Sequence, residues 1–219
     1  MGPRIACLLL MLAAALLPAS FLAALDMSAN TGMLLIGTVQ PAGTDAMNPT
    51  ITYVLGASIR LPIGGAFFLA PTLDFLGTYY QWVPTAGIAV PAQQETGSGF
   101  YTLGALAGAQ FGMEVPLSPV ISIGGSIGLD VLLRFPVALP DDGAASTAGQ
   151  AKAPAYFFGM GRFLYPETSL SFRWKVSNAV SLTVGIRAFY PVFHLWDGLN
   201  HPFVDQFMAS GSLGFGFTL

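Results

Sequence analysis

The chain ends in Ser210-Gly-Ser-Leu-Gly-Phe-Gly-Phe-Thr-Leu219, and this stretch decides how the rest of the sequence is interpreted. Successive side chains of a β-strand point to opposite faces, so Leu213, Phe215, Phe217 and Leu219 share one apolar face. Glycine, serine and threonine occupy the other face. Chain termini usually fray, and so apolar a strand at a terminus is expected where it must close a ring. The stretch therefore predicts the last strand of a small β-barrel that spans a membrane.

The composition indicates a membrane protein without membrane helices. Of the 219 residues, 9% are charged and 53% are hydrophobic, and the mean hydropathy is +0.64. An ordinary soluble domain has about 25% charged residues. A membrane helix needs about 20 consecutive apolar residues, but beyond the amino terminus Gly, Ser, Thr or a charge interrupts every apolar stretch. Because only helices and closed barrels satisfy their backbone groups in lipid, a barrel remains.

The first 24 residues have the pattern of a secretory signal peptide that is removed. Arg4 forms a short basic region, and residues 5–17 form an apolar core that is short for a membrane span. The alternative is a first membrane helix. Cys7 is the single cysteine and lies inside this core, so a mature chain of residues 25–219 has no disulfide or thiolate metal site. The net charge of −3 offers no basic patch for nucleic acid.

Seven further segments show the alternation of strands, namely residues 28–39, 51–61, 67–82, 101–114, 121–135, 168–176 and 180–190. Loops are expected at 40–49, 83–99, 136–154 and around His194 and His201, and short turns at 62–65, 116–119 and 177–178. Residues 155–167 alternate poorly, and an interfacial segment is one interpretation of them. Long loops that alternate with short turns are typical of transmembrane barrels. The sequence therefore predicts an all-β protein, an up-and-down antiparallel barrel of eight transmembrane strands.

Charged residues within the clear alternation all fall on the face of small and polar side chains. They are Arg60, Asp74, Glu114, Asp130, Arg134, Arg173, Lys175 and Arg187. An arginine or lysine that faces lipid costs about 2–4 kcal/mol at the bilayer midplane, so these residues are expected to face the lumen. An eight-stranded lumen is narrow enough for side chains to fill it. The charges therefore predict a salt-bridged plug, with Arg60, Glu114 and Lys175 at similar depth near the short turns and Asp74, Asp130 and Arg187 deeper. The alternative is a selectivity ring.

The sequence contains no convincing catalytic or metal-binding pattern. Only His194 and His201 could serve as a base, and both lie in the last long loop, where Asp197 and Asp205 could orient them. Two loop histidines and scattered acids provide too few ligands for a metal site. Glycines alternate along strands and form no phosphate-binding loop. We therefore predict that the protein is not an enzyme and has no cofactor.

The carboxyl-terminal stretch resembles the assembly signal of bacterial outer-membrane barrels, which Ser212, Gly214, Phe217 and Leu219 would form. The usual last residue of that signal is Phe or Trp rather than Leu. Strand number, length and loop pattern resemble the OmpW/OprG group of small outer-membrane proteins. OmpX-like and OmpA-like barrels are the nearest alternatives.

The resemblance implies an outer-membrane location in a diderm bacterium, with both termini and the short turns on the periplasmic side and the long loops outside. It implies lipid and the barrel assembly machinery as partners, and passive passage of small hydrophobic solutes as function. The alternative is a structural or adhesive barrel whose loops contact host molecules.

Pro71 interrupts the third predicted strand. Proline has no N–H for the ladder and is normally confined to edges, strand starts or bulges. A closed barrel has no edges, yet Pro71 lies several residues into the strand. The sequence therefore predicts either a bulge at Pro71 or a lateral seam at which the strand parts from a neighbour.

Overall fold

The computed structural model describes residues 25–38, 50–92, 99–137, 144–198 and 205–218. The predicted signal peptide, His201 and Leu219 lie outside the described residues. Within them the structure contains nine strands, one α-helix and two short 3-10 helices.

Eight strands form the barrel. They are β1 (Asp26–Ile36), β2 (Thr50–Gly64), β3 (Phe67–Val83), β5 (Gly99–Pro116), β6 (Ile121–Val137), β7 (Leu164–Lys175), β8 (Val180–Phe189) and β9 (Met208–Thr218). Each pairs antiparallel with its neighbours, β9 pairs with β1, and the pairing of β2 with β3 completes the ring. The predicted all-β fold, a closed antiparallel barrel of eight strands, is confirmed.

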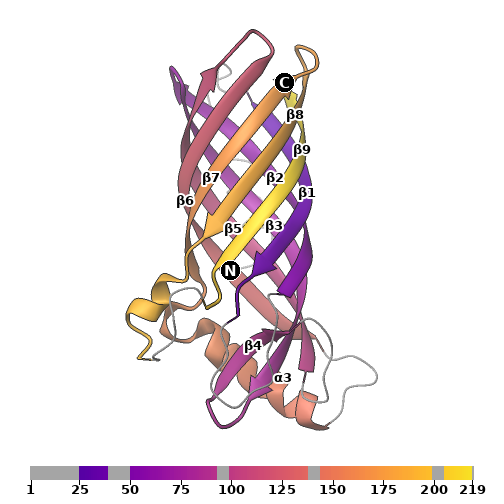
Figure 1. The fold of residues 1–219 in the computed structure, drawn as a ribbon, viewed down its shortest axis with the longest axis vertical. Coiled ribbons are helices and arrows are strands. Elements are labelled where there is room, and N and C mark those ends of the chain that lie inside the picture. Colours follow the sequence, from indigo (N-terminus) through magenta and orange to yellow (C-terminus); the bar gives the residue numbers. More distant parts are fainter. Residues whose placement is uncertain (1–24, 39–49, 93–98, 138–143, 199–204, 219) are drawn as a thin grey trace, which may run out of the picture.

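The two ends of the barrel differ (Figure 1). At one end short turns join β2 to β3, β5 to β6 and β7 to β8, and Asp26 pairs with Thr218. We call this the turn end. At the other end, called the loop end, β4 (Ile88–Ala92), α3 (Ala144–Phe158), η1 (Gly159–Gly161) and η2 (Val192–Leu195) lie beyond or beside the barrel wall.

The outer wall is apolar, as the alternation of the sequence requires. In β9, for example, Leu213, Phe215 and Phe217 are exposed or nearly so on the outside, and the glycines and serines between them line the lumen. Exposed apolar side chains cover the wall on every barrel strand, which suits contact with lipid and not with water. No helix among the described residues is long and apolar enough to cross a membrane.

The structure corrects two predicted loops. Residues 83–99 contain β4, which turns back at Gly87 (φ 66°) and pairs with Tyr79–Val83 of β3. Pro91 is tolerated because β4 is an edge strand with β3 as its partner in the described structure. Residues 136–154 contain most of α3, whose alanines favour a helix although Pro154 lies inside it.

Several predicted strand boundaries also shift, and β2 runs to Gly64, into the predicted turn at 62–65. β1 begins at Asp26 and ends at Ile36, whereas the predicted strand covered 28–39. β7 begins at Leu164 instead of residue 168, so the segment 155–167 contains the end of α3, η1 and the first residues of β7. The shifts of β1 and β7 each add a carboxylate to the inner face, Asp26 in β1 and Glu167 in β7.

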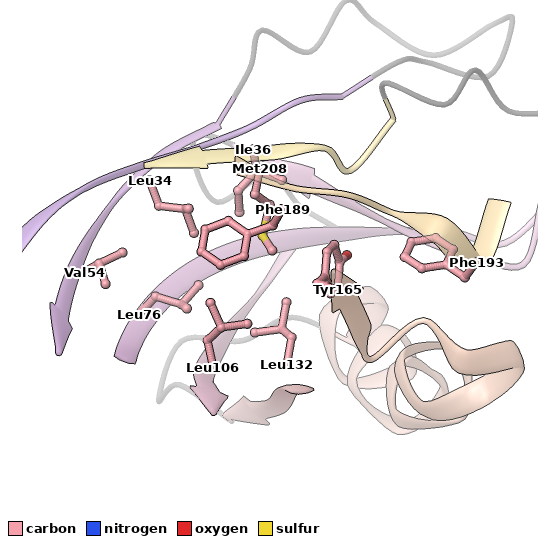
Figure 2. Close-up of a cluster of buried hydrophobic side chains, with 10 residues drawn as sticks. All are labelled: Leu34, Ile36, Val54, Leu76, Leu106, Leu132, Tyr165, Phe189, Phe193 and Met208. Atoms are coloured by element: carbon pink, nitrogen blue, oxygen red, sulfur yellow. The ribbon is translucent and has the colours of Figure 1, made fainter. Parts of the chain in front are cut away.

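The inner face is divided along the barrel axis. Towards the loop end, ten buried side chains form an apolar cluster inside the wall, shown in Figure 2. They are Leu34, Ile36, Val54, Leu76, Leu106, Leu132, Tyr165, Phe189, Phe193 and Met208. Small, hydroxyl-bearing and charged residues line the lumen from there to the turn end. The molecule thus has a polar and an apolar section in one narrow lumen.

Candidate functional site

The polar section of the lumen contains a small cavity and a wider vestibule. The cavity has a volume of about 100 Å³ and is lined by serines, threonines, Arg60, Arg173 and Arg187. The vestibule at the turn end measures about 450 Å³ and shares Arg60, Phe68 and Arg173 with the cavity. Water from the turn-end side therefore has room up to the level of Arg187.

Arg187 lies at the centre of the deepest charged network. Its Nε donates to Glu167 Oε1 at 2.6 Å, Nη2 donates to Glu167 Oε2 at 3.1 Å, and Nη1 donates to Asp74. Asp130 Oδ1 lies 3.7 Å from Nη2, and Gln110 donates to Glu167 at 2.8 Å. Three buried carboxylates thus surround one guanidinium, and they tie β3, β6, β7 and β8 together across the lumen.

A second set of ion pairs lies nearer the turn end. Arg60 pairs with Glu114, and Arg173 pairs with Asp26. Lys175 lines the vestibule, and no ion pair is recorded for it among the described residues. The structure brings Arg60 and Glu114 together as the sequence suggested, but it pairs Arg173 instead of Lys175 with a carboxylate.

Arg134 lies apart from both networks, at the loop end of the apolar cluster. It is 2% exposed, and its guanidinium carbon lies 4.4 Å from the centre of the Phe157 ring of α3. Nη2 donates to the carbonyl of Arg162 at 2.5 Å, and Nη1 reaches Gln206 Oε1 at 3.4 Å. Arg134 therefore anchors the helix and the last loop to the barrel and has no carboxylate partner in the described structure.

Sequence reasoning missed Asp26, Glu167 and the apolar section. Asp26 and Glu167 alternate in step with the lumen-facing residues of β1 and β7. Predicted strands that started earlier would therefore have placed both carboxylates in the lumen. Val54 and Leu76 alternate with the apolar residues of β2 and β3 and so fall on the lumen face, but their shared depth is visible only once the two strands are aligned. The signal that was overlooked is large apolar residues on the lumen face near the long loops.

The pairing of β2 with β3 is interrupted at two places. The register passes from Ser58↔Thr72 to Leu61↔Leu69, so the pairs opposite Pro71 and Ala70 are missing although the register is unchanged. On its other side, Pro71 is paired with Ala109 of β5. The register shift of this strand pair lies at Pro62/Gly64, away from Pro71.

The second interruption lies at the loop end. The ladder between β2 and β3 stops at Val54↔Leu76, while β2 stays paired with β1 up to Thr50 and β3 with β5 up to Gln81. From Tyr79 onwards the side of β3 opposite β5 pairs with β4, so at this interruption only Gly77 and Thr78 of β3 lack a strand partner on this side within the described structure. Thr52 Oγ1 donates to the carbonyl of Gly77 across the space between the two strands. Val54 and Leu76 both belong to the apolar cluster, so this unpaired stretch borders the apolar section directly.

His194 is held by neighbouring carboxylates at the loop end. Its Nδ1 lies 3.3 Å from Asp197 Oδ2, and its Nε2 lies 2.9 Å from the carbonyl oxygen of Asp205. Asp197 is also 3.5 Å from the guanidinium of Arg162. This arrangement fixes the last loop. Among the described residues, no group of three or more His, Cys, Asp or Glu side chains is placed to hold a metal ion.

Three residues of the predicted assembly signal lie in β9. Ser212 and Gly214 line the small cavity, and Phe217 is exposed on the outer wall, where it contacts the ring of Phe215. β9 is paired over its whole length with both β1 and β8. The last strand therefore closes the ring.

Comparisons with known proteins bear on the fold. No family model and no curated protein matches the sequence. Among solved structures, Neisserial surface protein A matches with a TM-score of 0.50 and 8% identity, over 89% of this chain and 97% of the other. Ail of Yersinia pestis matches at 0.44 and 9% identity, over 89% and 98%. The outer-membrane enzyme PagL matches at 0.39 and 18% identity, over 89% and 99%.

The likeness to Neisserial surface protein A agrees with the architecture derived from the chain itself. Closed pairing, an apolar outer wall and a polar, charged inner face define a transmembrane β-barrel of the eight-stranded class. At identities this low the likeness is one of fold, and the resemblance to the OmpW/OprG group remains a prediction from sequence.

Proposed function

We propose that this barrel lies in the outer membrane and passes small hydrophobic solutes from its loop end into the surrounding lipid. The observation that supports the proposal is the apolar section of the lumen, which borders the unpaired stretch between β2 and β3. An apolar solute that entered from the loop end would stay among Leu34, Val54 and Leu76 and avoid the charged section.

The unpaired stretch at the loop end suits a lateral exit better than Pro71 does. Behind Pro71 the lumen is polar, since Arg60, Thr72 and Gln110 line the cavity at that depth. A solute leaving there would first cross charged groups, which bind water and not hydrocarbon. The seam at Pro71 remains a separate prediction, and the variant Pro71→Ala tests it in the same uptake experiment.

A cysteine pair would test the route. Thr52 and Thr78 would face each other if the register continued past Val54↔Leu76, and Cys7, in the predicted signal peptide, is the only cysteine of the chain. In liposomes, Thr52→Cys with Thr78→Cys should slow uptake of a small apolar solute once oxidised, and reduction should restore it. The matched control is Ser58→Cys with Thr72→Cys, placed across a stretch that is already paired.

The result separates three possibilities. Equal uptake by the oxidised and reduced forms of the Thr52/Thr78 pair would contradict the loop-end exit. Slower uptake in Pro71→Ala, in a correctly folded barrel, would instead favour the seam at Pro71. If apolar and polar solutes both pass no faster than through protein-free liposomes, solute passage itself is contradicted.

A surface or adhesive barrel is the second candidate, and one feature favours it. β4 and α3 form a platform beyond the barrel with its own buried core, which includes Tyr80, Phe100, Ala153 and Phe157. Figure 1 shows this platform projecting beyond the strands. Binding to host cells that depends on Phe157 while solute uptake does not would favour this function.

A further inference from the structure

Four exposed apolar side chains come together beside the barrel, from two segments of the chain. Phe158 and Met160 come from the end of α3 and from η1, and Leu195 and Trp196 come from the end of η2. Their exposed fractions are 39%, 53%, 74% and 48%. Trp196 Nε1 donates to the carbonyl of Met160 at 2.7 Å, which joins the two segments. We call these four residues the rim patch.

Charges next to the rim patch are turned inward. Arg162 follows η1 and Asp197 follows Trp196, yet both are buried, and they lie 3.5 Å apart as an ion pair. Arg162 also lies over the ring of Tyr156, 4.5 Å from its centre. Water would favour the opposite arrangement, with the charges outside and the apolar side chains inside. The local structure therefore suits an apolar neighbour.

The backbone at Met160 supports the same conclusion. Met160 has φ 53° and ψ 25°, the left-handed region that L side chains rarely adopt, and it lies between two glycines. This conformation turns a large apolar side chain towards the outside, where it is 53% exposed. Strained conformations that persist without a packing reason often mark a functional contact.

The rim patch is tethered to the barrel wall by short stretches of chain. Met160 lies four residues before β7 begins at Leu164, and Leu195 lies six residues after β8 ends at Phe189. Such lengths span at most about 14 Å and 22 Å. In Figure 1 the coil that contains η2, in amber at the lower left, projects sideways from the wall and not along the barrel axis.

We propose that the rim patch is a membrane anchor that inserts into the interfacial region of the leaflet at the loop end. Tryptophan prefers this region because its ring is apolar while its N–H is polar, and here the N–H is already satisfied by Met160. The occupant is the lipid surface, because the patch is tethered within a few residues of the lipid-facing strands β7 and β8 and presents no exposed charge from Arg162 or Asp197. The anchor would hold the last loop and α3 against the bilayer.

The three tryptophans of the chain allow a direct test. Trp82→Phe with Trp174→Phe leaves Trp196 as the single tryptophan, whose emission is excited selectively over that of tyrosine, in a phosphatidylcholine bilayer. Lipids brominated near the top of the acyl chain should quench Trp196 strongly, and iodide in the water should quench it weakly. Strong iodide quenching with no effect of brominated lipid would overturn the proposal.

The other two single-tryptophan variants are the controls. Trp174 is exposed on the outer wall of β7, so brominated lipid should quench it, whereas Trp82 packs against the core of the platform and should respond weakly. A second copy of the chain as occupant predicts that lipid quenching of Trp196 falls as protein density in the bilayer rises. Quenching of Trp196 that does not change with protein density supports lipid as the occupant. Quenching that falls with protein density overturns the proposal.

A second variant keeps the test valid if the tryptophan replacements disturb folding. Leu195→Cys, labelled with a polarity-sensitive dye, reports the surroundings of the most exposed patch residue, and the mature chain offers no other thiol. The dye emission should shift to the blue in bilayers relative to Lys152→Cys on the exposed side of α3. Equal emission at both sites would overturn the proposal.

Discussion

At the scale of single residues, the lumen depends on a few buried ionic contacts, and the loss of any one partner should destabilise the barrel. Arg187 is held by Glu167 at 2.6 Å and 3.1 Å and by Asp74, and its side chain is 13% exposed towards the small cavity. Removing one buried partner of such a network takes away charge-assisted hydrogen bonds that water at the site cannot fully replace. The network therefore sets the stability of the barrel wall as well as the chemistry of the lumen.

Glu167→Gln should destabilise the barrel by about 1.5–3 kcal/mol, because the Arg187 guanidinium loses its bidentate charged partner in a buried site and keeps Asp74. Urea unfolding in detergent micelles measures this change. Glu114→Gln is the matched control, because the Glu114 side chain is 21% exposed to the vestibule and should cost less. Equal losses of unfolding free energy in the two variants would show that the burial of Glu167 does not make its ion pair more important than that of Glu114.

The outer wall gives a second prediction at this scale. Leu129→Arg places a charge on the exposed lipid face and should impair insertion into bilayers by about 2–4 kcal/mol. Thr183→Glu places a charge in the lumen cavity directly opposite Arg173 of β7 and should be tolerated better. Folding yield in liposomes measures both effects. Equal yields would contradict the assignment of Leu129 to the lipid face and of Thr183 to the lumen.

At the scale of elements, the platform of β4 and α3 is stabilised by its own core and should unfold separately from the barrel. Phe157 is fully buried against Tyr80, whose ring centre lies 4.9 Å away, and against Arg134. Phe157→Ala should cost about 3–5 kcal/mol locally. Limited proteolysis should then cut α3 while the strands stay protected, and loss of the whole barrel would show that platform and barrel are one unit.

Elements also show what the sequence can and cannot predict. The barrel strands follow from alternation, because a transmembrane strand must keep apolar residues on one face over its whole length. α3 escaped prediction because its buried residues Ala153, Tyr156 and Phe157 are recognisable only from the strands that cover them. β4 is five residues long and is defined by its pairing with β3.

The sequence predicts which face the charged residues occupy and their approximate depth, but not which of them form ion pairs. Alternation places Asp74, Asp130 and Arg187 on the inner face, whereas their meeting depends on how far neighbouring strands are staggered. That stagger also decides that Leu34, Val54 and Leu132 reach the same level. Sequence patterns fix the face of each strand and leave the relative shift of the strands open.

At the scale of the whole molecule, ring closure should make the barrel resistant to detergent. Every barrel strand is paired on both sides, apart from the interruptions between β2 and β3. We expect the unheated protein to migrate faster than the boiled protein in dodecyl sulfate gels, with a circular dichroism spectrum dominated by strand. A helical spectrum would contradict the fold.

The division of the lumen has an electrical consequence. Water can occupy the vestibule and the small cavity, but ten apolar side chains interrupt the water column towards the loop end. An ion would have to shed its hydration there, at a cost of many kcal/mol. Inserting the barrel into a planar bilayer should therefore add no steady current under an applied voltage, and stable conductance steps would contradict a dry section. A cell could then carry many copies without making its envelope leaky to salts.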